Sequence, residues 1–203
     1  TMLAPDGRRI MIGWMQSWDS NIRPADQKWS CMMTIPRELR IKHGKILQCP
    51  VREIEKYHRN AVCYQDKEIS GNCQLEGICG RVLDMTVEIV RGDFRQFTIS
   101  LARNERYHTD FTILKDSNMV EIDRTYSGMV HDTIAIRKAK MKTSTDKLQL
   151  RFILDKYSVE IFLNDGQQVL SSTFYTPIEA DGIRFVCDGK AVVNIQKYDI
   201  VVD

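Results

Sequence analysis

The sequence has little tryptophan and proline beyond its first quarter. All three tryptophans (Trp14, Trp18 and Trp29) and four of the five prolines precede residue 51, and only Pro177 follows. A uniform domain does not usually divide in this way, so the composition predicts one domain preceded by a piece of another. A chain of 203 residues is long enough for that organisation. It begins with Thr1 rather than methionine, as expected for a processed or excised piece.

Other absences exclude several classes of protein. Basic and acidic residues number 29 and 27, so no excess of positive charge attracts nucleic acid or an anionic membrane. The sequence has no apolar run of the roughly 18 residues that a membrane helix needs, no signal peptide and no glycine-rich phosphate-binding loop. The six cysteines form no C-x-x-C pair, and the four histidines have no metal-ligand spacing. We therefore expect no metal, no cofactor, and neither a nucleic-acid nor a membrane partner.

The cysteines also indicate the cellular compartment of the protein. Their even number would allow three disulfides, but a domain of this size does not need them. Free cysteine behaves as a small buried hydrophobe. We therefore expect reduced thiols and a cytoplasmic location.

The first fifty residues have the pattern of short antiparallel strands joined by turns. Strands are predicted over residues 8–14, 29–35 and 45–48. A polar loop is predicted over residues 17–28, and a tight turn at His43 and Gly44. This stretch is too small to enclose a core alone. Apolar residues at helical spacing after Pro50 predict a short linker helix over residues 51–59.

From residue 60 onward, apolar residues alternate with polar ones, as in strands with one face on a core and one in water. The segments with this pattern, together with the expected last strands, are residues 83–89, 97–101, 148–152, 159–163, 182–186 and 191–202. Phe162 is an exception on a polar face, and residues 164–166 supply an N-D-G hairpin turn. About ten to twelve short strands and no long helix predict an all-β fold, in which residues 60–203 form a β-sandwich of two antiparallel sheets.

The charged residues offer few candidates for catalysis. Asp84 and Glu88, like Glu121 and Asp123, alternate with apolar residues, so each pair is most simply the solvated face of a strand. The two carboxylates of a glycoside hydrolase must instead face each other in a cleft. The scattered histidines, among them His58, are assigned solvated or hydrogen-bonding structural roles.

The three tryptophans allow two interpretations. Aromatic rings pack on the apolar faces of sugars, so Trp14, Trp18 and Trp29 could line a carbohydrate cleft. Large aromatic rings also dominate protein cores and interfaces, and composition alone favours that role for each of them.

Four segments carry a family likeness. Residues 7–15 read G-R-R-I-M-I-G-W-M, residues 29–39 read W-S-C-M-M-T-I-P-R-E-L, residues 48–51 read Q-C-P-V, and residues 158–166 read S-V-E-I-F-L-N-D-G. Taken in this order, these segments resemble glycoside hydrolase family 32. That family holds the invertases, sucrose-6-phosphate hydrolases, levanases and exo-inulinases.

The resemblance implies a five-bladed β-propeller followed by a β-sandwich. It places residues 1–50 in a remnant of the last propeller blade and residues 60–203 in the sandwich. It also implies retaining hydrolysis of β-fructosides by an aspartate nucleophile in N-D-P-N-G, a second aspartate in R-D-P and a glutamate in E-C-P. None of these motifs occurs in this sequence, and retaining hydrolysis needs two carboxylates. We therefore expect an inactive C-terminal fragment without catalytic residues of its own.

The resemblance implies one substrate contact, because Trp14 matches a family tryptophan that lines the fructose pocket. The expected partners are the upstream propeller, a fructoside bound through the parent enzyme, and a second copy of the chain through exposed strands in residues 1–50. The alternative is a stand-alone β-sandwich module that binds carbohydrate or mediates dimerisation. The lack of tryptophan after Trp29 argues against sugar binding by the sandwich.

Overall fold

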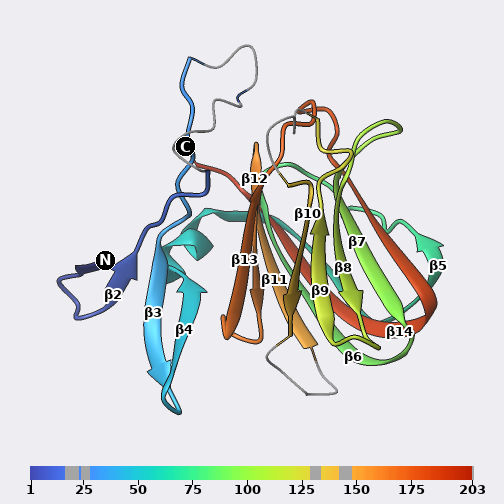
Figure 1. The fold of residues 1–203 in the computed structure, drawn as a ribbon, viewed down its shortest axis with the longest axis horizontal. Coiled ribbons are helices and arrows are strands. Elements are labelled where there is room, and N and C mark those ends of the chain that lie inside the picture. The colour runs from blue at the N-terminus through green and yellow to red at the C-terminus, as the bar shows by residue number, and fades with distance from the viewer. Residues whose placement is uncertain (17–22, 24–27, 129–133, 142–147, 203) are drawn as a thin grey trace.

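The chain folds into two β-sheets connected by a short 3-10 helix, η1 (Arg52–Tyr57) (Figure 1). The computed structural model describes residues 1–16, 23, 28–128, 134–141 and 148–202. The smaller, N-terminal sheet has four antiparallel strands in sequence order: β1 (Met2–Leu3), β2 (Arg9–Met11), β3 (Arg37–Lys42) and β4 (Lys45–Pro50). It stands beside β12 and β13 of the larger sheet (Figure 1). Within the described residues, no helix is long and apolar enough to cross a membrane.

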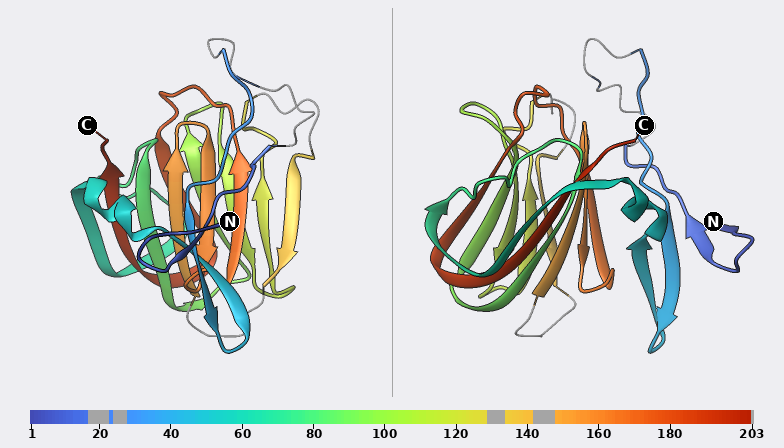
Figure 2. Two further views of the ribbon diagram at one scale, coloured as in Figure 1. Left: turned by 90° about the vertical axis from the view of Figure 1, so that its left-hand side faces the viewer. Right: turned by 180° about the vertical axis from the view of Figure 1, so that it is seen from behind.

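The larger sheet forms the β-sandwich. Its ten antiparallel strands are β5 (His58–Cys73), β6 (Leu83–Asp93), β7 (Gln96–Arg103), β8 (Thr109–Leu114), β9 (Met119–Asp123), β10 (Ile136–Lys140), β11 (Leu148–Asp155), β12 (Ser158–Leu163), β13 (Gln168–Thr173) and β14 (Gly182–Ile200). Their order is β10-β9-β8-β7-β14-β6-β11-β12-β13, and β5 pairs with β14. The sheet curls so that β7 to β10 form one layer and β6 with β11 to β13 form the other (Figure 2). The predicted all-β sandwich is therefore confirmed.

β14 carries the sheet from one layer to the other. Residues 182–187 pair with β7, whereas residues 190–199 pair with β6. Gly189 lies between the two halves, where a Cβ would stand 2.1 Å from the carbonyl oxygen of Asp93. The pattern predicted two separate last strands, but the structure joins them because the hydrogen-bonded ladder continues through this bend.

The core lies between the two layers and is built around aromatic rings. Phe111 on β8 meets Phe152 on β11 edge to face, with 5.5 Å between the ring centroids. Phe97 and Phe185 lie 6.3 Å apart in the same core, and all four side chains are fully buried. The inward-facing residues of the alternating segments, such as Met85, are buried as the pattern predicted.

The strand predicted over residues 29–35 is wrong. These residues make only an isolated bridge, between Met33 and Trp14, and the strand begins later, at β3. The reason lies in the sandwich, because the amide of Ile35 donates a hydrogen bond to the carboxylate of Glu160 at 2.6 Å. A side chain therefore accepts the hydrogen bond that a neighbouring strand would otherwise take.

Three further differences concern the strands and the first loop. The strand predicted over residues 8–14 is limited to β2. β5 was not predicted, because residues in the left-handed conformation interrupt its alternation of apolar and polar residues. Asn60 and Asp66 have φ of 51° and 47°, and each lies where the register of β5 against β14 shifts. Most of the loop predicted over residues 17–28 lies outside the described residues.

Replacing Gly189 with alanine is expected to lower the free energy of unfolding by about 1–3 kcal/mol, because the added methyl group meets backbone that cannot move aside. Urea unfolding measures this loss. Gly13→Ala is the control, since its Cβ would stand 3.9 Å from Thr34 in ordinary contact. A Gly189→Ala protein as stable as the wild type would contradict the constraint at the bend.

Candidate functional site

The structure places Trp14 on an exposed segment that continues from the N-terminal sheet. The Thr34 amide donates to the Gly13 carbonyl oxygen at 2.8 Å, and the Met15 amide donates to the Met32 carbonyl oxygen at 2.8 Å. The Trp14 side chain itself is 64% exposed. The backbone is therefore held by its neighbours, while the indole ring is left at the surface.

The described tryptophans are not core residues. Trp14 and Trp29 are both exposed, and Trp18 lies outside the described residues. Met33, which is bridged to Trp14, is also exposed. Apolar side chains that gather at a surface are typical of a region that binds a ligand or another part of a protein.

A buried ion pair joins the N-terminal sheet to the sandwich. Arg37 on β3 donates from Nε to Glu160 Oε2 on β12 at 2.8 Å, and a terminal guanidinium nitrogen of Arg37 donates to the same oxygen. The two side chains are only 7% and 2% exposed. Burial raises the pKa of Glu160 above its ordinary value, whereas Arg37 and the Ile35 amide oppose that rise by stabilising the carboxylate. Charges buried this deeply need a partner, so the pair fixes how the two sheets meet.

Arg37 has further partners from both sheets. It donates to Gln48 Oε1 on β4 at 2.8 Å and to Ser171 Oγ on β13 at 2.6 Å. Its guanidinium also lies 5.5 Å from the centroid of the Phe162 ring. This contact explains why Phe162 interrupts the polar pattern of its strand: its outward-facing ring is covered by Arg37 and buried.

The N-D-G hairpin between β12 and β13 packs against the backbone of β4. The Gln48 amide donates to the Gly166 carbonyl oxygen at 3.0 Å, and Cys49 Sγ donates to the Asp165 carbonyl oxygen at 3.2 Å. Gly166 has a φ of +77°, and a Cβ there would stand 1.8 Å from the Gln48 carbonyl oxygen. Only glycine permits this approach.

We call these contacts the junction; its residues are Ile35, Arg37 and Gln48 on one side and Glu160, Gly166 and Ser171 on the other. Sequence reasoning missed the junction, although all of its residues except Ser171 lie in the segments that carried the family resemblance. One signal was present. Glu160 is a carboxylate inside an almost wholly apolar strand, which is unusual for a buried position.

A second ion pair holds η1 against Arg8, the residue just before β2. The guanidinium of Arg8 donates to both carboxylate oxygens of Glu53, at 3.0 and 2.5 Å, and from Nε to Asp6 at 2.7 Å. The bidentate hydrogen bonds from Arg8 lower the pKa of Glu53 to about 2. The connection between the two sheets is therefore tied to the N-terminal sheet on one side.

The expectation that Asp84 lies on a solvated face is wrong. Its carboxylate is buried and accepts hydrogen bonds from Arg151 at 2.9 and 2.6 Å. His58 Nε2 lies 2.9 Å from the same carboxylate, and its ring stacks on Tyr198 at 4.3 Å. Glu55 of η1 lies 3.8 Å from Arg151, so the linker covers this part of the sheet. The hydrogen-bonding structural role expected for His58 is confirmed.

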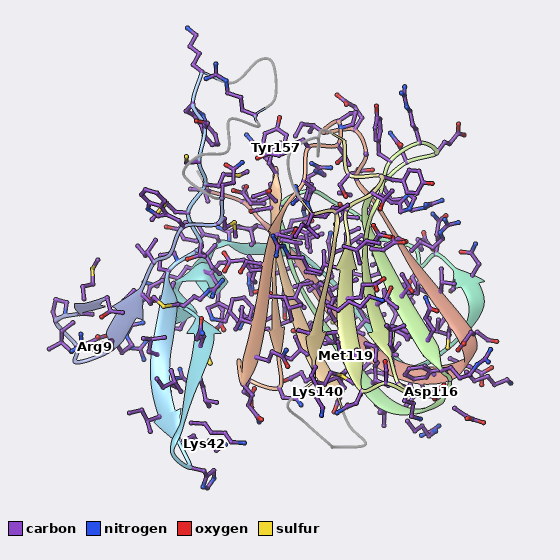
Figure 3. The ribbon with its side chains drawn as sticks, in the orientation of Figure 1. Arg9, Lys42, Asp116, Met119, Lys140 and Tyr157 are labelled. Atoms are coloured by element: carbon purple, nitrogen blue, oxygen red, sulfur yellow. The ribbon has the colours of Figure 1, made fainter. Side chains whose placement is uncertain are left out.

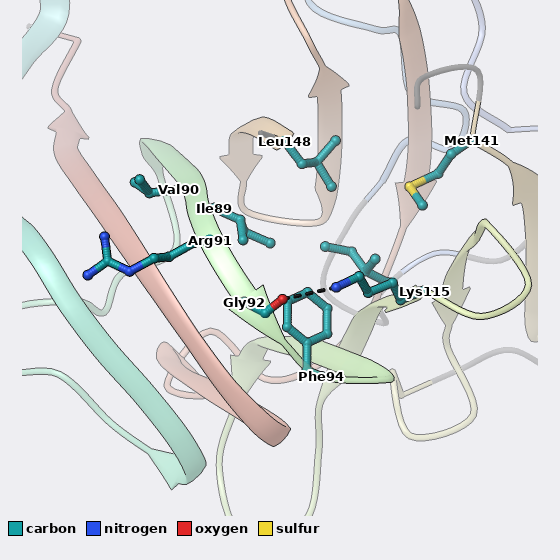
Figure 4. Close-up of a pocket in the computed structure, with 9 residues that line it drawn as sticks. Ile89, Val90, Arg91, Gly92, Phe94, Lys115, Met141 and Leu148 are labelled. Atoms are coloured by element: carbon teal, nitrogen blue, oxygen red, sulfur yellow. Dashed lines mark hydrogen bonds between the residues drawn. The ribbon is translucent and has the colours of Figure 1, made fainter. Parts of the chain in front are cut away.

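Two hollows in the described part of the sandwich do not resemble a glycosidase site. A hollow of about 260 Å³ beside η1 has two carboxylates in its lining, Glu55 and Asp84, but both interact with Arg151, which donates to Asp84 at 2.9 Å and lies 3.8 Å from Glu55. Among the described residues, those that line a hollow of about 310 Å³ at one end of the sandwich include no carboxylate (Figure 4). There Lys115 donates to the Gly92 carbonyl oxygen at 2.9 Å and lies over the Phe94 ring. Among the described residues, no group of three histidine, cysteine or acidic side chains could hold a metal ion.

Comparison with known families identifies the class of protein. The model described as "Glycosyl hydrolases family 32 C terminal" matches residues 53–201, and the one described as "Glycosyl hydrolases family 32 N-terminal domain" matches residues 1–50. The chain belongs to glycoside hydrolase family 32.

Individual relatives agree with this membership. The chain is 30% identical to a sucrose-6-phosphate hydrolase of Staphylococcus xylosus, over 98% of this chain and 41% of that protein. It is 32% identical to a raffinose invertase of Escherichia coli, over 96% of this chain and 40% of that protein. The fold matches a sucrose-6-phosphate hydrolase from Lactobacillus gasseri with a TM-score of 0.82 at 21% identity, over 98% of this chain and 40% of that one. The chain thus spans about 40% of the length of these relatives.

Replacing Glu160 with glutamine is expected to lower the free energy of unfolding by about 3–5 kcal/mol, because Arg37 then stays buried without a counter-charge. The double variant Arg37→Met/Glu160→Gln should lose less than the two single variants together, since neither charge remains. Urea unfolding of the four proteins measures both effects. Lys138→Ala, which breaks a pair between an exposed lysine and the half-buried Glu121, should cost about 0–1 kcal/mol. Equal losses for Glu160→Gln and Lys138→Ala would contradict the role given to the junction.

Proposed function

We propose that the chain is the C-terminal part of a β-fructoside hydrolase that acts on sucrose, sucrose 6-phosphate or fructans. The two family matches support this proposal, because they follow each other in the order of the family's domains. The names of the relatives, which include invertase, sucrose-6-phosphate hydrolase and levanase, support the substrate class. The catalytic carboxylates would lie in the upstream propeller, and this chain alone would be inactive.

The chain would divide into a remnant of the last propeller blade at residues 1–50, a linker at residues 51–59 and the sandwich at residues 60–203. The junction is the observation that carries this proposal. It couples the N-terminal sheet to the sandwich through a buried, directional ion pair, which is the contact expected of a module that supports a neighbouring catalytic domain.

The N-terminal sheet has an apolar surface that the rest of a propeller would cover. Ile41 on β3 and Ile46 on β4 stand opposite each other and are 82% and 64% exposed. We assign Trp14 to the fructoside pocket of the complete enzyme, where its exposed ring would pack on the sugar. All six cysteines are free thiols, which supports a cytoplasmic location.

The purified chain is expected to release no sugar from sucrose, sucrose 6-phosphate or inulin above background, because it lacks the three carboxylate motifs. A full-length enzyme that carries this chain behind its propeller should hydrolyse at least one of the three. A reducing-sugar assay compares the two proteins under the same conditions. Turnover by the chain alone, or none by the full-length enzyme, would contradict the proposal.

The purified chain is also expected to self-associate through residues 1–50, because their strands expose an apolar face and an open edge. Ile41→Lys/Ile46→Lys should shift the chain toward monomer in sedimentation velocity at matched concentrations. Val202→Lys, at an exposed position outside this region, is the control. A wild-type chain that stays monomeric at high concentration would contradict this expectation.

A further inference from the structure

Contacts of the neighbouring residues fix the backbone of Trp14. The strand β2 ends at Met11, and beyond it the described backbone is held by the isolated bridge from Trp14 to Met33 and by the Gly13 amide, which donates to Thr34 Oγ1 at 3.0 Å. Two residues further along, Gln16 reaches across to the sandwich. Its side-chain amide donates to the hydroxyl of Tyr175 at 2.5 Å, which links two positions 159 residues apart.

Tyr175 is held firmly within the sandwich. Its amide donates to the Ser127 carbonyl oxygen at 2.8 Å, and its own carbonyl oxygen lies 2.3 Å from where a Cβ of Gly128 would stand. The ring is buried, with its centroid 6.1 Å from that of Tyr157, which lies at the upper end of the sandwich in Figure 3. The hydroxyl of Tyr175 therefore has a fixed position, and it binds the exposed segment at Gln16.

The residues on both sides of Tyr175 are also held in place. Buried Arg81 donates to Thr176 Oγ1 at 2.5 Å and to the Ala180 carbonyl oxygen at 3.0 Å. It also lies 4.9 Å from the centroid of the Phe174 ring. The residues on both sides of Tyr175 are thus held by one guanidinium.

We infer that Tyr175 is a positioning residue for fructoside binding. Through Gln16 it holds residues 13–16 and so sets where the exposed ring of Trp14 stands. The sandwich then contributes to substrate affinity without touching substrate. This inference rests on the proposed function, because it requires Trp14 to line the fructoside pocket.

The test uses the full-length enzyme that carries this chain, with the fructoside that the wild type hydrolyses fastest. Tyr175→Phe keeps the buried ring and removes only the hydroxyl that accepts from Gln16. Loss of one hydrogen bond predicts a rise in KM of about three- to tenfold, with kcat within about twofold, because a misplaced Trp14 weakens binding before reaction. Gln16→Leu should give the same change.

A double-mutant cycle distinguishes positioning from a general loss of stability. Trp14→Ala should raise KM, and adding Tyr175→Phe to it should raise KM no further, because no ring is left to position. Tyr157→Phe is the matched control and should leave KM unchanged. Thermal unfolding of each variant is measured alongside.

Three outcomes would overturn the inference. The first is an unchanged KM for Tyr175→Phe, even if the melting temperature falls. The second is an effect of Tyr175→Phe that adds in full to that of Trp14→Ala. The third is a full-length wild-type enzyme without fructoside hydrolysis, which would overturn the proposed function as well, whereas the first two leave that function standing.

Discussion

The ion pair between Arg37 and Glu160 is the interaction on which the arrangement of this chain depends. Arg37 and Glu160 are both buried where their sheets would otherwise present an apolar or neutral face. Burying either charge without the other would lower the stability of the protein. Apolar contact alone tolerates sliding, whereas a guanidinium with partners on β4, β12 and β13 accepts one orientation. The pair therefore defines the docking of the N-terminal sheet on the sandwich as well as stabilising it.

Other contacts also fix the position of the N-terminal sheet on the sandwich. The backbone of Gly166 fits against Gln48 with no room for a side chain. Arg8, just before β2, binds Glu53 of the linker, and Glu55 of the linker lies 3.8 Å from Arg151 on the sandwich. Together these contacts join the N-terminal sheet, from which the exposed segment with Trp14 continues, to the sandwich.

Part of this structure could be predicted from the sequence, because it depends on local patterns. Period-two alternation indicated the buried faces of segments such as residues 83–89. The junction could not be predicted in this way, since Arg37 and Glu160 are 123 residues apart and no local pattern relates them. Asp84 was misassigned for the same reason: alternation gives the face of a strand, but not whether a linker covers it. Composition likewise could not say that Trp14 is exposed, because a large aromatic ring is compatible with either environment.

The central position of β14 in the sheet affects when the sandwich can fold during synthesis. β14 pairs with β5, β6 and β7, yet it is the last strand of the sandwich to leave the ribosome. Until residues 182–200 emerge, β6 and β7 have no partner on one edge and the two layers have no shared strand. The sandwich must therefore close after its synthesis is nearly complete, in a step dominated by contacts distant in sequence. During that interval its open strands are exposed to other chains, and chaperones that cover strand edges would matter most then.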